Sequence, residues 1–78
     1  MKVTLESTDK IVTLVLSNGT EVPARIWEGH TTQGIACHAY ITRIGVAEHD
    51  DAAEFERDLR EQRKPSAAVA AIPHRLIV

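Results

Sequence analysis

The sequence predicts a single small α+β domain over residues 1–78, in which an antiparallel sheet of four or five strands carries one main helix. Three observations favour this class. The first half of the chain alternates apolar and polar residues with the period of two that is typical of strands. Asn18-Gly19 is a strong hairpin signal. A charged stretch at about residues 50–64 lies between a capping pattern and a proline, as a helix does.

The N-terminal third is expected to form strands. A first strand around Val3 and Leu5 precedes a polar turn at residues 7–10, and a second strand covers residues 11–16. Asn18 and Gly19 predict a type I′ turn, because both residues tolerate a positive φ.

The strand at residues 21–27 has two different faces. Val22, Ala24 and Ile26 share the first face, and Glu21, Arg25 and Trp27 share the other. Pro23 cannot donate a backbone hydrogen bond, so the strand is expected to lie at an edge there or to carry a bulge.

A polar loop is expected at residues 28–34, and the longest strand follows at residues 35–46. One face of that strand carries Ile35, Cys37, Ala39 and Ile41. Residues 44 and 46 fall on the opposite phase. Either a bulge near residues 42–43 returns them to the core, or both faces of the strand are partly covered.

The main helix, at about residues 50–64, is expected to pack on the sheet. Asp51 and Glu54 have the spacing of a capping box, and basic residues at the end suit the helix dipole. The apolar stripe is narrow: Ala52, Phe55 and Leu59. After Pro65, a short helical turn at residues 67–72, capped by Ser66, and a final strand at residues 75–78 are predicted. The strand is expected at an edge or beside an early strand. A small SH3-like or OB-like barrel is the alternative fold.

Composition limits the function classes. A chain of 78 residues buries a thin core, and an oligomer or a partner would add to it. The net charge of -2 makes nucleic acid an unlikely partner. One cysteine allows no intramolecular disulfide, and with no signal-peptide pattern this predicts a cytoplasmic location. No apolar run approaches the roughly 20 residues of a membrane span.

No catalytic, cofactor-binding or metal-binding constellation is recognisable, so the chain is not expected to be an enzyme. Cys37 and His38 are neighbours in a predicted strand and would point to opposite faces. The four histidines lack the spacing of a zinc site: His30, His38, His49 and His74. The acidic group at the helix start suits the helix dipole: Asp50, Asp51, Glu54 and Asp58. Residues 29–34 do not match a phosphate-binding loop.

Five residues are candidates for contact with a partner: Trp27, Arg25, Tyr40, Arg60 and Arg63. Trp27 and Tyr40 fall out of phase with the apolar residues of their strands, and aromatic residues are enriched in binding hot spots. The alternative for Trp27 is that the helix covers it with Phe55 and Leu59. The basic helix end at residues 60–64 either contacts an acidic surface or nucleic acid, or is simply solvated.

Four segments carry a family resemblance: residues 21–29 (EVPARIWEG), 39–46 (AYITRIGV), 55–66 (FERDLREQRKPS) and 72–78 (IPHRLIV). They resemble short uncharacterised proteins encoded by tailed bacteriophages and prophages of proteobacteria. The resemblance implies stoichiometric binding to a host protein, for example inhibition of a defence system such as CRISPR–Cas.

Three functions remain open from the sequence. The first is a phage-type accessory protein that binds a host protein in the host cytoplasm. The second is a homo-oligomeric structural or virion-assembly protein, which the thin core and the edge near Pro23 favour. The third and weakest is a regulator that binds nucleic acid.

Overall fold

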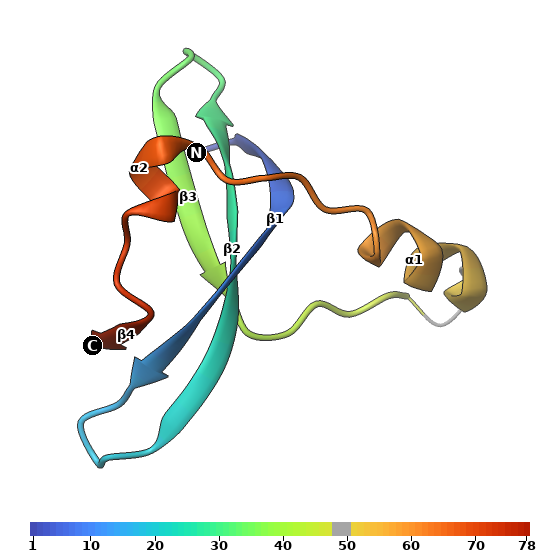
Figure 1. Cartoon of the computed structure of the whole chain (residues 1–78). Coiled ribbons are helices and arrows are strands. Elements are labelled where there is room, and N and C mark those ends of the chain that lie inside the picture. Colours follow the sequence, from blue (N-terminus) through green and yellow to red (C-terminus); the bar gives the residue numbers. More distant parts are fainter. Residues whose placement is uncertain (48–50) are drawn as a thin grey trace.

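The computed structural model describes residues 1–47 and 51–78. Its centre is a four-stranded sheet in the order β3-β2-β1-β4 (Figure 1). The strands are β1 (Val3–Val15), β2 (Glu21–Thr31), β3 (Ala36–Ile41) and β4 (Arg75–Ile77), and the helices α1 (Ala52–Leu59) and α2 (Ala67–Ala70) come between β3 and β4. The predicted α+β class is confirmed. The sheet is mixed rather than purely antiparallel, because β4 runs parallel to β1.

β1 continues through residues 7–10, where the sequence predicts a turn. The pairing with β2 shifts there, since Ser7 lies opposite Trp27 and Ile11 lies opposite Arg25. Three residues of β1 therefore face one residue of β2, as in an enlarged β-bulge. The Thr8 hydroxyl is buried and donates to the carbonyl of β2 residue 26 over 2.6 Å. The prediction of a turn was wrong because the Thr8 hydroxyl bonds to β2, while the side chains of Ser7, Asp9 and Lys10 interact with residues 61–74.

The β1–β2 hairpin forms where the sequence predicts it, but with another turn. The amide of Leu16 donates to the Thr20 carbonyl over 2.8 Å, and the amide of Gly19 donates to the Leu16 carbonyl over 2.9 Å. Of the described non-glycine residues none has a positive φ, and Gly19 has a φ of 84°. The loop therefore has three residues, of which only the glycine is left-handed. A type I′ turn has two residues, and both have a positive φ.

The two faces of the sheet differ in what covers them. On the first, which we call the core face, Val12, Ala24 and Ile26 are buried together with Val69 of α2. The predicted inward phase of β2 is therefore confirmed. We call the opposite face the open face, and it carries Trp27 and Arg25, which lie directly opposite residues 39 and 41 of β3.

β2 is longer, and β3 shorter, than the sequence predicts. Residues 28–31, expected in a loop, extend β2 because all four pair with β1 and residues 28–30 also pair with β3. β3 ends at Ile41, so no bulge forms at residues 42–43, and Ile44 and Val46 lie exposed beyond the strand. Because the last β3 pair joins Ile41 to Arg25, Pro23 has no β3 neighbour. β2 is a central strand of the sheet, but around Pro23 it is an edge, as the sequence predicts.

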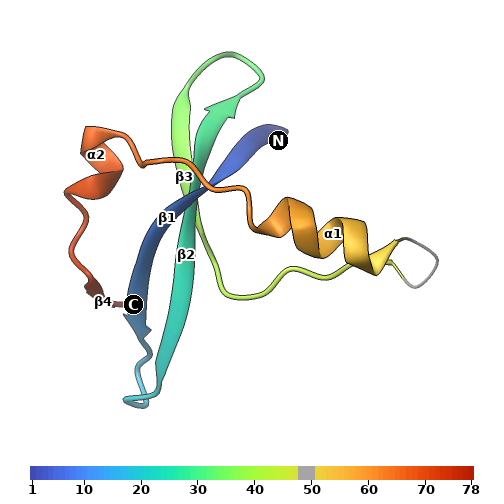
Figure 2. The same ribbon diagram turned by 45° about the vertical axis from the view of Figure 1, so that its right-hand side comes forward.

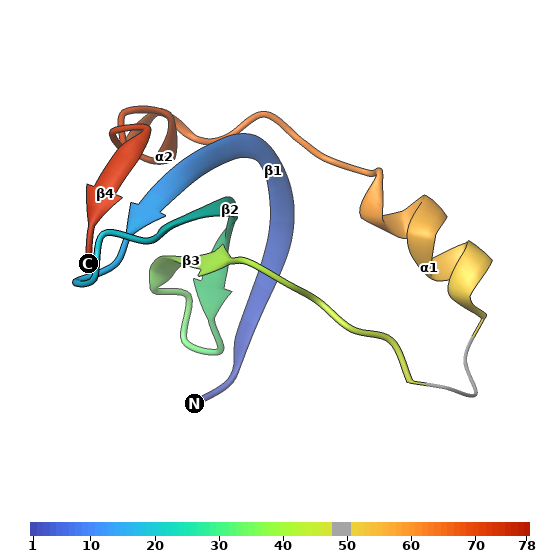
Figure 3. The same ribbon diagram turned by 90° about the horizontal axis from the view of Figure 1, so that it is seen from below.

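α1 is not the main packed helix that the sequence predicts. Its eight residues include no buried side chain, and it stands away from the sheet in all three ribbon views (Figure 1, Figure 2 and Figure 3). The predicted first residue, Asp50, lies outside the described residues. The helix ends before residue 60 because residues 61–63 bond to β1: the amide of Arg63 donates to the Ser7 carbonyl over 3.2 Å.

The C-terminal elements agree with the sequence. The Ser66 hydroxyl caps α2 by accepting from the amide of Val69. β4 pairs with the end of β1 at the edge of the sheet, where Leu76 lies opposite Leu14. The covering of the core face therefore comes from residues 66–77 rather than from the charged helix.

The predicted cap of α1 gives a testable expectation. The Asp51 carboxylate accepts from the amides of Ala53 and Glu54 over 3.0 and 3.2 Å. In Asp51→Ala, these amides should exchange with solvent about fivefold faster, since a lost N-cap costs about 1 kcal/mol. Hydrogen exchange followed by NMR measures this. Asp58→Ala should not accelerate exchange, because an acid in the last turn opposes the helix dipole; unchanged exchange in Asp51→Ala would contradict the cap.

Candidate protein-binding site

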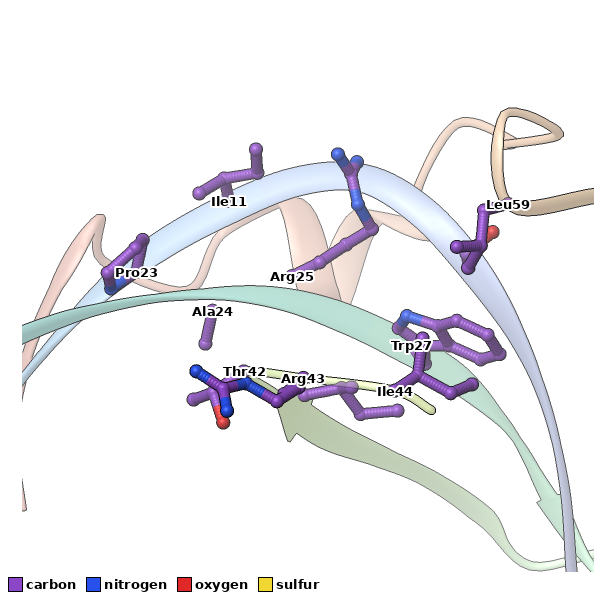
Figure 4. A pocket seen from close by; sticks show the side chains of 11 residues that line it. Ile11, Pro23, Ala24, Arg25, Trp27, Thr42, Arg43, Ile44 and Leu59 are labelled. Atoms are coloured by element: carbon purple, nitrogen blue, oxygen red, sulfur yellow. The ribbon is translucent and has the colours of Figure 1, made fainter. Parts of the chain in front are cut away.

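A groove of about 210 Å³ runs along the open face (Figure 4). We call it the Trp27 groove. Sheet residues form its floor, the segment after β3 forms one wall, and the last turn of α1 reaches it. The lining residues are Ser7, Ile11, Pro23, Ala24, Arg25, Trp27, Ile41, Thr42, Arg43, Ile44 and Leu59. Ile11 and Ile44 are exposed, at 49% and 43%.

Two of the five candidate residues lie together in this groove. Trp27 is half-buried, and Leu59 of α1 and Ile44 lie beside its indole ring in Figure 4. Arg25 is also half-buried, and its guanidinium Nη1 donates to the Thr8 carbonyl over 2.8 Å. That bond anchors Arg25 to the bulge of β1. Leu59 thus lines the same groove as Trp27, whereas Phe55, the other helix residue expected over Trp27, does not line it.

Tyr40 lies on the opposite face of the sheet from Trp27. It is directly opposite Ile26, so its side chain is on the core face, beyond the part that α2 covers. The Tyr40 hydroxyl is 3.1 Å from Nε2 of His38, and the two rings meet edge to face. The sequence places both aromatics out of phase, but the structure does not bring them together.

The basic residues after α1 separate into two environments. Arg60 is exposed at the helix end. Arg63 is half-buried, and its Nη1 is 2.7 Å from Oε1 of Glu28 while its Nε is 3.6 Å from the Glu6 carboxylate. The charge of Arg63 is therefore already paired within the chain.

Glu28 is a buried carboxylate that the sequence analysis assigned to a loop. It is 7% exposed, and besides the bond from Arg63 it accepts from the Ser66 amide over 2.6 Å and from the Ser66 hydroxyl over 2.7 Å. Burial raises its pKa, but the bonds from Ser66 and Arg63 and the charge of Arg63 outweigh burial, so the pKa lies below the ordinary value of 4.5. The alternation of β2 places Glu28 on the same face as Ala24 and Ile26, and this pattern in the sequence could have indicated its burial.

Lys10 is a second buried charge that sequence reasoning missed. Its Nζ donates to the Ala70 carbonyl at the end of α2 over 3.1 Å and lies 3.5 Å from Nε2 of His74. A cation is favourable at a helix C-terminus. Glu28 and Lys10 thus fasten residues 63–74 to the core face, and neither lines the Trp27 groove.

The charged residues that line the groove are all basic. Arg25 and Arg43 line it, and none of the lining residues is acidic. This contrasts with the net charge of -2 for the whole chain. A partner that fits it would combine an apolar side chain with a carboxylate.

Within residues 1–47 and 51–78, no three His, Cys, Asp or Glu side chains gather as a metal site would require. Cys37 is a half-buried free thiol. His49 and Asp50, two of the residues considered for metal binding, lie outside the described residues. No described helix has the length and apolar character needed to cross a membrane.

Comparison with models of protein families, with curated proteins and with solved structures gave no match to this chain.

Proposed function

We propose that this chain is a small binding protein without catalytic activity, which acts by occupying the surface of another protein through the Trp27 groove. One observation carries the proposal: an apolar, cationic groove lies on a sheet face that α2 leaves uncovered. Large aromatic and arginine side chains at the centre of such surfaces contribute most of the binding energy in protein interfaces.

The chemistry of the groove specifies the partner. The isoleucines and Trp27 provide apolar surface, and Arg25 is already held in place by its bond to Thr8. An arginine that is fixed before binding loses less conformational entropy when it pairs with a carboxylate. The partner segment therefore presents an apolar anchor next to an Asp or Glu.

The resemblance to phage-encoded proteins supports a concrete version of this function. In it the partner is a host protein, and the chain acts in the host cytoplasm as an inhibitor of a defence system such as CRISPR–Cas. Occupying a protein surface one-to-one requires no catalytic residue. A small binding protein with a surface groove of this kind is suited to such a role.

Ile44→Asp tests the proposal. It places a negative charge at the groove wall without touching the buried core, and Ile77→Asp on exposed β4 is the matched control. A host protein captured by the wild type and by Ile77→Asp should bind Ile44→Asp at least about tenfold more weakly, since burying an unpaired carboxylate costs more than about 1.4 kcal/mol. Trp27, the only tryptophan, reports binding directly by its fluorescence.

Two results would contradict the proposal. One is that Ile44→Asp retains the captured protein as strongly as the control does. The other is that the Trp27 emission does not change when the partner is added. The CRISPR–Cas version is checked separately by expressing the chain in a host with active interference, where phage infection should recover with the wild type and not with Ile44→Asp.

A further inference from the structure

The chain exposes more surface than a self-sufficient monomer of its size. Its accessible area is 5956 Å², whereas a folded monomer of 8.6 kDa is expected to expose about 4,700 Å². Its radius of gyration is 13.9 Å, against about 11.5 Å expected for 78 residues. The excess of about 1,250 Å² exceeds the roughly 800 Å² that each partner buries in a standard protein interface.

Of the two terminal strands of the sheet in the part of the chain that the structure describes, β3 has the longer free edge. β3 is the terminal strand of the order β3-β2-β1-β4, and its six residues compare with three in β4 at the other end. Monomeric proteins protect such edges with charged residues, prolines or bulges. β3, with the sequence ACHAYI, contains no lysine, arginine, acid or proline.

Side chains on and beside β3 are also exposed. Tyr40 is 38% exposed on the core face, where it contacts His38, and Ile35 immediately before the strand is 64% exposed. Aromatic and isoleucine side chains at a sheet edge stabilise cross-strand pairing when a second strand lies beside them.

We infer that a second copy of this chain covers the β3 edge, so that the two sheets join into one eight-stranded sheet. A strand edge pairs antiparallel with its own copy about a two-fold axis, and this pairing leaves neither β3 edge free for a third copy. In such a pair both copies keep the same face, so Tyr40 and His38 of one copy lie beside those of the other. The groove residues Arg25 and Trp27 lie on the opposite, open face.

The inference is independent of the partner proposed for the Trp27 groove, and the two tests separate them. His38→Lys/Tyr40→Lys places two lysines on exposed positions of β3, and across the two-fold axis they face like charges. Ser17→Lys/Gln33→Lys adds the same charge at exposed turn residues and is the control. In sedimentation equilibrium, the wild type and the control should have twice the mass of 8.6 kDa, and the β3 variant should dissociate at least about tenfold more readily.

A second measurement does not depend on the variants. Hydrogen exchange of the wild type at high and low concentration should show protection of β3 amides that falls on dilution, whereas protection in β1 stays the same. A wild type that stays monomeric at about 1 mM, a β3 variant that dimerises like the control, or β3 protection independent of concentration would each overturn the inference. Ile44→Asp should still dimerise.

Discussion

Gly29→Ala is expected to destabilise the fold by about 3 kcal/mol or more. Gly29 lies near the end of β2, where it is paired on one side with Leu5 of β1 and on the other with Cys37 of β3. A Cβ atom at Gly29 would lie 1.8 Å from the carbonyl oxygen of Thr4 and 2.8 Å from its carbonyl carbon. Both atoms belong to the backbone of β1, so the strands must separate. Urea unfolding monitored by circular dichroism measures the loss.

Gly45→Ala is the matched control for this substitution. A Cβ atom at Gly45 meets nothing within 4 Å, and its φ is not positive. Its free energy of unfolding should stay within about 0.5 kcal/mol of the wild type. If Gly29→Ala were as stable as Gly45→Ala, the close approach of β1 and β2 at this position would be wrong.

Glu28→Gln should reduce the free energy of unfolding at pH 7 by about 2–3 kcal/mol. The Glu28 carboxylate accepts from Arg63 and twice from Ser66, at distances of 2.6–2.7 Å. A glutamine amide offers one acceptor oxygen and turns an NH2 group toward donors. We expect Glu28→Gln to lose less free energy of unfolding than the disruption of a fully buried ion pair would. The reason is that the Arg63 side chain is 39% exposed and its charge is partly screened by solvent.

The effect of Glu28→Gln should depend on pH. The pKa of Glu28 is lower in the folded protein than its ordinary value of 4.5, so the carboxylate stabilises the fold above that value. This contribution is lost as the pH falls through the lower, folded pKa. The difference between wild type and Glu28→Gln should therefore be largest near neutral pH and shrink on acidification below about pH 4.5. Urea titrations at a series of pH values measure it.

Glu6→Gln separates the buried carboxylate from an exposed one. The Glu6 carboxylate also approaches Arg63, but at 3.6 Å and with 70% of its side chain exposed. Glu6→Gln should therefore lower the free energy of unfolding by no more than about 0.5 kcal/mol, as for most surface ion pairs. Equal losses for Glu6→Gln and Glu28→Gln, or a Glu28→Gln deficit that is the same at pH 3 and pH 7, would contradict the role given to Glu28.

Glu28 also bears on the candidate site. By binding Arg63 and Ser66 it fixes the segment that returns from α1 to the sheet. Leu59, at the end of α1, lies a few residues before that anchor and lines the Trp27 groove. If residues 63–66 become more mobile, the position of Leu59 in the groove should change as well. Affinity measurements on Glu28 variants need a stability control for this reason.

Local patterns in the sequence determined the α+β class, the β1–β2 hairpin, the caps at Asp51 and Ser66, and the inward phase of Ala24 and Ile26. Each depends on residues close together in the chain, whose backbone preferences and periodicity act locally. The same phase argument placed Trp27 and Arg25 on the face opposite the core, where they line one groove.

Only the tertiary structure decided the rest. The bulge at residues 8–10, the extension of β2 through Glu28 and the early end of α1 depend on bonds to residues 18 to 60 positions away. Such bonds override local preference: Thr8, Lys10 and Glu28 read as turn or loop residues because they are polar, yet they are buried once distant partners satisfy them. The separation of Tyr40 from Trp27 has the same origin, since the strand register assigned them to opposite faces.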